Sequence, residues 1–236
     1  MQLKTLLSAT AVRQIIGPPD RTVENIAYDS RRVHRNGMFV ALRGEKSDAH
    51  EFIGQAIEKG ASVIVAEREE QNPRGTCLVV ENTRTALADF AATFYGYPER
   101  KLKMAAVTGT NGKTTTTFLV KHICENAGLR CGLIGTVRYE IGERVLPAIR
   151  TTPESLDLQE LLAQIVNAGC KAAAMEVSSH ALAQDRTRGL EWNVAVFTNL
   201  TQDHLDFHGT MKNYFESKTK LFTGLGSQKK KRKPVA

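Results

Sequence analysis

The fold is decided by the stretch VTGTNGKTTTT at residues 107–117. A short apolar run at 104–107 leads into it and is typical of a buried strand, and residues 118–123 follow it with helical spacing. A strand, a glycine loop, Lys-Thr and a helix form the layout of a phosphate-binding loop, whose backbone N–H groups point at phosphate oxygens. In such a loop Lys113 reaches the β- and γ-phosphates, and the Thr114 hydroxyl can ligate Mg²⁺.

The strict pattern for such a loop, G-x-x-x-x-G-K-[ST], requires a glycine five residues before Gly112, and Val107 stands there. The alternative is a turn that only caps a helix, with Thr110 or Asn111 as the N-cap. We favour the nucleotide-binding interpretation because Gly-Lys-Thr lies between a strand and a helix. The residues expected around the nucleotide are Gly109, Thr110, Asn111, Gly112, Lys113, Thr114 and Thr115.

The composition is that of an ordinary soluble protein. The 236 residues are 42% hydrophobic and 24% charged, enough for one large domain or two small ones. No apolar run reaches 18 residues, and the first residues resemble no signal peptide, so we expect no membrane partner. The four cysteines are widely spaced, which favours reduced thiols and a cytoplasmic location.

Most of the net charge of +7 comes from one basic run at 229–233. Such a run can be a nuclear signal or a nucleic-acid patch, but more often it is a solvated loop. We favour the loop, because no aromatic residues interleave with the run to stack on bases. No nucleic-acid partner is therefore expected.

Residues 1–98 predict a small α/β domain. Strands are expected at 22–27, 38–42, 62–66 and 76–80, a helix around 52–57 that Gly60 ends, and a second helix at 84–95. The Gly96-Tyr97-Pro98 segment then marks a domain boundary.

Residues 99–236 alternate strand and helix. Strands are expected at 104–107, 131–136, 172–177 and 193–199, a hairpin at 137–149, and helices after Thr152-Pro153-Glu154 and at 214–222. Apolar runs between helices predict a mostly parallel, doubly wound sheet of the P-loop type, buried on both faces. The chain stops where a new strand could begin, so we expect this second domain to be truncated.

Polar groups are expected to gather at one edge of that sheet, where ligands bind at the carboxyl ends of parallel strands. Glu176 ends one apolar run, and Thr198-Asn199 ends another. A carboxylate placed there is costly to bury unless it meets a cation, so we favour Glu176 as a Mg²⁺ ligand over a cap for the next helix.

Further candidates follow the same strands. His204 is a possible metal ligand or base that Asp203 and Asp206 would orient, with a polar loop as the alternative. Thr151 and Thr152 precede a helix and suit a cap or an anion. His180, Gln184 and Arg186 follow the Glu176 strand, and Arg186 and Arg188 could hold carboxylate or phosphate groups. The alternative for each of them, taken singly, is an ordinary surface residue. Lys218 and Lys220 lie in the last helix, where charged residues are usually solvated.

These segments together resemble the Mur ligase family. The segments that carry the resemblance are TGTNGKTTT at 108–116, MEVSSH at 175–180, and TNL with DHLD between 198 and 206. DSR at 29–31, GMFVA at 37–41 and TTPE at 151–154 further resemble the branch of the family that adds diaminopimelate or lysine to UDP-N-acetylmuramoyl-L-alanyl-D-glutamate. The resemblance covers almost the whole chain.

The resemblance implies a cytoplasmic ATP-dependent ligase of peptidoglycan precursor synthesis. ATP would phosphorylate the D-glutamate carboxylate, and the amine of the incoming amino acid would attack the acyl phosphate. It also implies that Thr114 ligates a first Mg²⁺, that Glu176 and His204 serve a second, and that Lys218 carries a carbamate, which overturns its interpretation as a solvated residue. The residues that would hold the UDP-linked substrate are Ser30, Thr151, Thr152, Ser178, Gln184 and Arg186.

The chain also departs from the family. Arg150 stands where some relatives carry Asn, and the family has a longer central domain and a third domain that selects the amino acid. We therefore expect residues 1–236 alone to have little ligase activity. Two alternatives remain, a folylpolyglutamate-synthase-like ligase and a nucleotide-binding module without catalysis. The domain before the loop argues against the first, and the joint presence of Lys113, Glu176, His204 and Lys218 argues against the second.

Overall fold

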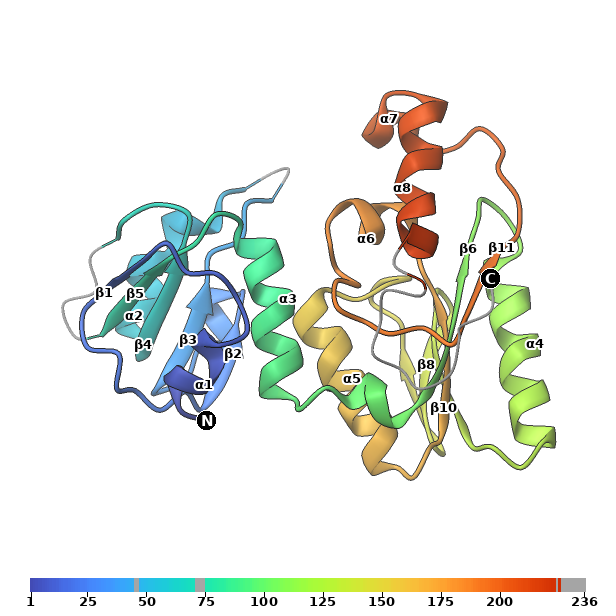
Figure 1. Ribbon diagram of the computed structural model, residues 1–236, viewed down its shortest axis with the longest axis horizontal. Helices are drawn as coiled ribbons and strands as arrows, with labels where there is room; N and C mark the ends of the chain where they lie inside the picture. Colours follow the sequence, from blue (N-terminus) through green and yellow to red (C-terminus); the bar gives the residue numbers. More distant parts are fainter. Residues whose placement is uncertain (45–46, 71–74, 224, 226–236) are drawn as a thin grey trace. The chain divides into compact units, whose positions relative to one another are not determined.

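The structure is a computed structural model that describes residues 1–44, 47–70, 75–223 and 225 (Figure 1). The chain divides between Gly96 and Tyr97 into two compact units, two residues before the boundary proposed after Pro98. The basic run at 229–233 lies outside the described residues. No helix in the described ranges is long and apolar enough to cross a membrane.

The first unit, Met1–Gly96, is built on a five-stranded sheet with the strand order β1-β5-β4-β3-β2. The strands are β1 (Gln14–Ile16), β2 (Asn25–Ala27), β3 (Gly37–Val40), β4 (Ala61–Ala66) and β5 (Thr76–Val79). β2 to β5 pair in parallel, and β1 pairs antiparallel with β5. The four parallel strands confirm the four predicted ones, whereas β1 and α1 (Leu3–Leu7) are too short to give a periodic signal.

The helices of the first unit follow from the sequence pattern. α2 (Ile53–Glu58) and α3 (Thr83–Phe94) confirm the two predicted helices. The apolar face of α2 packs on the sheet in a core that includes Phe39 and Ile64. α3 begins where the Asn82 side chain accepts hydrogen bonds from the backbone N–H groups of Arg84 and Thr85, which is an N-cap.

The second unit, Tyr97–Ala236, is built on a six-stranded sheet with the strand order β11-β6-β10-β7-β8-β9. The strands are β6 (Lys103–Thr108), β7 (Cys131–Ile134), β8 (Arg138–Ile141), β9 (Arg144–Pro147), β10 (Ala172–Glu176) and β11 (Val194–Phe197). The helices are α4 (Lys113–Asn126), α5 (Ser155–Asn167), α6 (Ser179–Ala183), α7 (Leu205–His208) and α8 (Met211–Thr223). β11, β6, β10 and β7 are parallel, and β8 and β9 form the predicted antiparallel hairpin.

Helices cover both faces of this sheet, which confirms the predicted α/β fold. On β10, Ala173 and Met175 belong to a core that α5 completes, whereas Ala172 and Ala174 face a cluster that includes Phe118 of α4. Alternate residues of a strand point to opposite faces, so α4 and α5 lie on opposite sides of the sheet, as Figure 1 shows.

The parallel strands bring the predicted polar residues to one edge. Glu176 at the end of β10 pairs with Val107 of β6, and Phe197 of β11 pairs with Thr108. The loop after β6, the carboxylate that ends β10 and the segment after β11 therefore leave the sheet side by side.

Candidate active site

The glycine loop enters α4 without a side-chain cap. Gly112 is the N-cap with φ of 80°, and α4 begins at Lys113. The alternative in which Thr110 or Asn111 caps the helix is therefore wrong. A helix start with no side chain on its first N–H groups is suited to an anion, since those groups and the helix dipole both favour negative charge.

Gly109 is fixed by its surroundings as well as by its backbone. Its φ is 141°, and a Cβ at this position would lie 1.9 Å from Thr198 Oγ1. Any side chain would collide with the segment after β11, so only glycine fits here.

The segment after β11 holds the loop in place. Asn111 N donates to Asn199 Oδ1 at 3.0 Å, and Thr198 Oγ1 donates to the Asn111 carbonyl at 2.7 Å. Thr110 N donates to the Asn199 carbonyl at 2.9 Å. The loop is therefore held in one conformation before any ligand arrives, which reduces the entropy cost of binding.

Glu176 is buried and bound by two threonines. It is 1% exposed, Thr114 Oγ1 donates to its Oε2 at 3.0 Å, and Thr136 donates to it through both N (2.9 Å) and Oγ1 (3.0 Å). Glu176 does not cap α6, because Ser178 Oγ does so by accepting from Ala181 N. Donors on both oxygens fix the orientation of the Glu176 carboxylate at the end of β10.

Two lysines converge on the loop. Lys113 Nζ donates to the carbonyls of Gly109 (2.9 Å) and Thr110 (2.7 Å), and Lys218 Nζ donates to the Gly109 carbonyl at 2.8 Å. Burial lowers the pKa of Lys113. Burial, followed by the charge of Lys113, lowers the pKa of Lys218 to about 8.

The expectation that Lys218 lies on a solvated face is wrong. Lys218 is 1% exposed, and its Nζ lies 4.4 Å from the centroid of the Tyr214 ring, whereas Lys220 is exposed. Tyr214 OH lies 3.1 Å from Thr110 Oγ1, so one aromatic side chain touches both the loop and Lys218.

His204 lies near Tyr214 rather than in contact with Glu176. Its ring centroid is 6.1 Å from that of Tyr214 and 4.7 Å from that of His180, and its Nε2 is 3.4 Å from Asp203 Oδ2. Asp203 therefore contacts His204 and can orient its ring, as expected. Among the described residues, no contact between Asp206 and His204 is found. His204 has a positive φ of 51° and keeps 44% of its side chain exposed.

The doubled threonine, Thr151-Thr152, extends the hydrogen-bond network around Glu176. Thr152 Oγ1 donates to the Glu176 carbonyl at 2.9 Å and accepts from Ser178 N at 3.0 Å, so its hydroxyl is already used. Thr151 Oγ1 lies 3.0 Å from Thr136 Oγ1. Thr151 is therefore the member of the pair with the freer hydroxyl.

Arg186 is held in place by protein groups. Its Nη1 donates to the Thr152 carbonyl at 3.1 Å, its Nη2 donates to Gln184 Oε1 at 2.5 Å, and its Nε lies 3.4 Å from the buried carboxylate of Glu154. Gln184 and Arg186 thus lie together beside the doubled threonine. Arg188 is exposed.

In the first unit, Ser30 lies at the start of a 3₁₀ turn. Ser30 Oγ donates to Gln55 Oε1 at 2.5 Å, and Asp29 caps the turn by accepting from Arg31 N at 2.9 Å. Arg31 also binds the Asp29 carboxylate, and this holds the pKa of Asp29 below its usual range.

The oxygen donors suit Mg²⁺. A hydroxyl and a carboxylate, Thr114 Oγ1 and Glu176, already lie 3.0 Å apart, and Mg²⁺ needs only one or two protein ligands because it keeps waters and phosphate oxygens. Within the described ranges, no group of three or more His, Cys, Asp or Glu side chains is close enough to hold a metal by itself. Lys218 would become a ligand only as a carbamate, since an ammonium has no lone pair.

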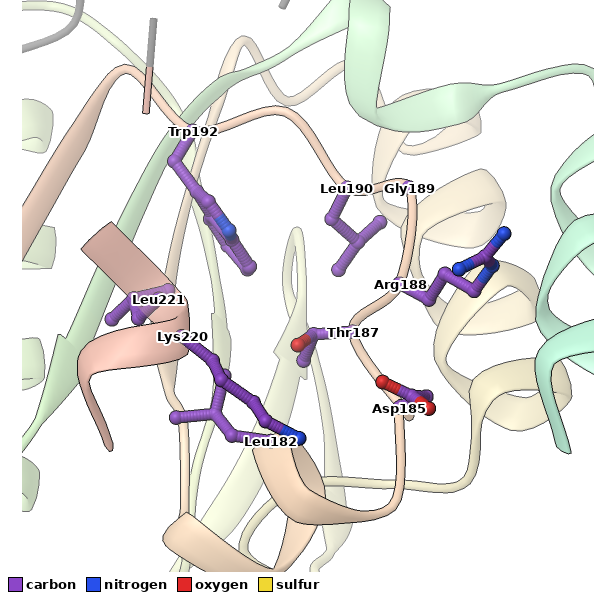
Figure 2. Close-up of a pocket in the computed structure, with 9 residues that line it drawn as sticks. All are labelled: Leu182, Asp185, Thr187, Arg188, Gly189, Leu190, Trp192, Lys220 and Leu221. Carbon is purple, nitrogen blue, oxygen red and sulfur yellow. The ribbon is translucent and has the colours of Figure 1, made fainter. Parts of the chain in front are cut away.

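A separate pocket lies beside the loop that follows α6. It has a volume of about 160 Å³ and is lined by Leu182, Asp185, Thr187, Arg188, Gly189, Leu190, Trp192, Lys220 and Leu221. Figure 2 shows the Thr187 side chain directed between Leu190 and Leu182, while Arg188 points away. Apart from Arg188, none of the candidate binding residues lines this pocket.

Two site residues are not predicted from the sequence. Thr136 follows Gly135, which comes directly after β7. A Cβ on Gly135 would lie 2.4 Å from Glu176 Oε1, so glycine leaves room for that carboxylate. A Gly-Thr pair after a buried strand is therefore the sequence pattern that could have pointed to Thr136. Tyr214 is spaced by four and seven residues from Lys218 and Leu221, which places the three on one helix face.

Comparison with known proteins gives matches over both units. The model of the Mur ligase middle domain matches residues 107–231, and that of the Mur ligase family catalytic domain matches residues 22–95.

The chain is also similar to curated proteins named UDP-N-acetylmuramoyl-L-alanyl-D-glutamate–2,6-diaminopimelate ligase. It is 48% identical to the one from Clostridium tetani over 94% of this chain and 47% of the relative, and 46% identical to the one from Geobacillus thermodenitrificans over 99% and 48%. A solved structure of a ligase of that name superposes with a TM-score of 0.78 at 29% identity, over 94% of this chain and 45% of the other. The chain spans about half the length of the curated relatives it matches.

Proposed function

The chain belongs to the Mur ligase family, and on that premise we propose that it binds ATP–Mg²⁺ and the UDP-linked substrate for an ATP-dependent ligase of peptidoglycan precursor synthesis. The ligase would join 2,6-diaminopimelate to UDP-N-acetylmuramoyl-L-alanyl-D-glutamate. Diaminopimelate is preferred over lysine because the curated relatives at 44–48% identity are named for it. Since the chain spans about half of those relatives, the reaction is proposed for the whole protein.

The observation that carries the proposal is the hydrogen-bonded series Thr114–Glu176–Thr136–Thr151. It joins the first turn of α4 to the doubled threonine through contacts of 2.9–3.0 Å. The nucleotide would occupy one end of this series and the UDP-linked substrate the other. A purely structural loop has no need of a buried carboxylate between two such ends.

The proposed reaction follows from these positions. A D-glutamate carboxylate oxygen attacks the γ-phosphorus of ATP, and ADP leaves. The amine of diaminopimelate then attacks the acyl carbon, loses a proton and expels inorganic phosphate. Lys113 neutralises charge on the transferred phosphoryl group, and the loop N–H groups hold the remaining phosphate oxygens. Thr114 would hold a first Mg²⁺, and Glu176, His204 and a carbamate on Lys218 would serve a second. The bound ions would supply further neutralisation of charge.

The division of labour between the units is also a proposal. Residues 1–98 would hold the UDP part through Ser30, and residues 99–236 would form part of the ATP-binding domain. Thr151, Ser178, Gln184 and Arg186 would contact the sugar–dipeptide. Thr152 would support them, because its hydroxyl already serves the backbone of Glu176 and Ser178.

Phosphate release by the whole protein tests the proposal. We expect release from ATP only when UDP-N-acetylmuramoyl-L-alanyl-D-glutamate and diaminopimelate are both present. Release that depends instead on a pterin-glutamate substrate would favour the folylpolyglutamate-synthase-like alternative. Tight ATP binding with no substrate-dependent release would favour a non-catalytic module.

A further inference from the structure

His208 lies between α6, which follows Glu176, and α8, which carries Lys218. It ends α7 and is 7% exposed. Its Nε2 is 2.9 Å from Ser179 Oγ on α6, and its Nδ1 is 3.3 Å from Ser217 Oγ on α8. One imidazole therefore joins the helix that follows Glu176 to the helix that carries Lys218.

The direction of these hydrogen bonds follows from the partners of Ser217. Ser217 Oγ donates its hydrogen to the Asn213 carbonyl at 2.9 Å, so towards His208 it can only accept. Nδ1 therefore carries a proton, and in the neutral imidazole Nε2 accepts from the Ser179 hydroxyl. The bridge uses the neutral imidazole, which agrees with the lowered pKa of His208 caused by burial and then by the charges of His180, His204 and Lys218.

The bridge contacts α8 at the residue next to Lys218. Ser217 immediately precedes Lys218, whose ammonium reaches the Gly109 carbonyl at 2.8 Å, and Ser179 follows Glu176 by three residues. A second tether, from Asn213 Nδ2 to the His208 carbonyl at 2.9 Å, holds the start of α8 to the same residue. A small rotation of α8 would move Lys218 away from the loop.

We propose that His208 is a positioning residue, which sets the place of Lys218 relative to the phosphate loop and Glu176 through the Ser179–His208–Ser217 bridge. The expected loss of catalytic rate rests on the proposed function. The expected displacement of the Lys218 side chain does not. Displacing a reacting group by about 1 Å can cost about a hundredfold in rate, so even a modest rotation of α8 would be measurable.

The first experiment measures the place of Lys218 in the chain itself, without any substrate. Acylation of individual lysines by an amine-reactive reagent is followed by mass spectrometry, with the exposed Lys220 as the internal standard. In the unchanged chain Lys218 should react much more slowly than Lys220. In His208→Leu and in the milder Ser179→Ala the ratio should rise several-fold, and in His208→Asn, whose amide can still donate to Ser217, it should rise less. His34→Leu, at an exposed histidine, is the control and should leave the ratio unchanged.

The second experiment measures catalysis in the whole protein. Ser179→Ala should lower kcat about tenfold or more, while the KM for ATP should change by less than about threefold because the loop and Lys113 are unaltered. Unchanged labelling of Lys218 in folded Ser179→Ala and His208→Asn chains, checked by circular dichroism, would overturn the positioning role. Increased labelling in a protein that proves to have no ligase activity would leave that role intact and refute the proposed function instead.

Discussion

Lys113 and Lys218 donate to the same oxygen atom, the carbonyl of Gly109, at 2.9 and 2.8 Å. Two ammonium groups on one acceptor repel each other, and burial strengthens that repulsion. The arrangement favours any change that removes one positive charge or adds a negative one. Binding of a phosphate at Lys113 and loss of the proton from Lys218 are two such changes.

The first prediction concerns the pH dependence of stability. The pKa of Lys218 falls from its ordinary 10.5 to about 8 in the folded chain, so between these values the unfolded state binds more protons. The free energy of unfolding should therefore gain a rising contribution as the pH increases through this window. Denaturant titrations at several pH values should show that contribution in the unchanged chain and lose it in Lys218→Met. Identical pH profiles for the two chains would contradict the burial of a charged amine at this site.

The second prediction concerns carbamate formation. A lysine with a pKa of about 8 has a substantial neutral fraction at physiological pH, and the neutral amine is the form that attacks CO₂. With ¹³C-labelled bicarbonate, the NMR spectrum of the chain should show a carbamate signal that disappears in Lys218→Ala. The signal should persist in Lys220→Ala, the matched exposed lysine on the same helix. Its survival in Lys218→Ala would assign the carbamate to another amine.

The third prediction concerns the need for Lys218 in catalysis. In the whole protein Lys218→Ala should abolish substrate-dependent phosphate release, because it removes both the group at the Gly109 carbonyl and the proposed carbamate. Short carboxylates added to the assay should restore part of the activity by supplying the missing oxygen ligands. Lys220→Ala should be close to the unchanged protein. Unchanged activity in Lys218→Ala would remove Lys218 from the mechanism.

The fourth prediction concerns Thr136, which the sequence does not single out. Thr136→Val keeps the shape and the backbone donor to Glu176 but removes the hydroxyl that contacts both Glu176 and Thr151. Loss of such a supporting contact to a metal-binding carboxylate typically costs about 10–100-fold in activity or metal affinity. Thr136→Ser should recover most of the loss. Equal activities for the Val and Ser variants would show that the hydroxyl has no role.

The fifth prediction concerns Gly109. Gly109→Ala would place a Cβ 1.9 Å from Thr198 Oγ1 at a residue with φ of 141°, so the loop must move. ATP binding by the chain, measured by calorimetry, should fall below detection. Gly54→Ala, in α2 with nothing within 4 Å of the new Cβ, should bind as the unchanged chain does. Retained binding in Gly109→Ala would show that the loop is more adaptable than its contacts indicate.

The elements of the fold are predicted well where the sequence pattern is long or strongly apolar. The apolar run at 172–177 and the helical spacing after Thr152-Pro153-Glu154 correctly predict β10 and α5, because both elements are buried along most of their length. β1 and α1 are missed because three and five residues contain no usable period. The edge that carries the site follows from parallel pairing alone.

The contacts within the site are predicted less well, because they depend on register and helix rotation. The distance from Thr114 to Glu176 is set by how β6 pairs with β10, which no local pattern encodes. Its charge alone predicts that Lys218 is exposed. Lys218 shares a buried helix face with Tyr214 and Leu221, so tertiary packing outweighs the usual preference of lysine for solvent. The contact of Thr136 with Glu176 depends on Gly135, because the missing side chain of Gly135 leaves room for the Glu176 carboxylate.

The most direct test of the proposed ligase is the fate of the D-glutamate carboxylate oxygens. The whole protein is given ATP, diaminopimelate and UDP-N-acetylmuramoyl-L-alanyl-D-glutamate labelled with ¹⁸O in that carboxylate, and the phosphate released is analysed by mass spectrometry. If the carboxylate attacks the γ-phosphorus and the amine then displaces phosphate, one ¹⁸O atom should appear in each phosphate formed. Peptide formation with unlabelled phosphate, or phosphate release without the UDP-linked substrate, would contradict the mechanism.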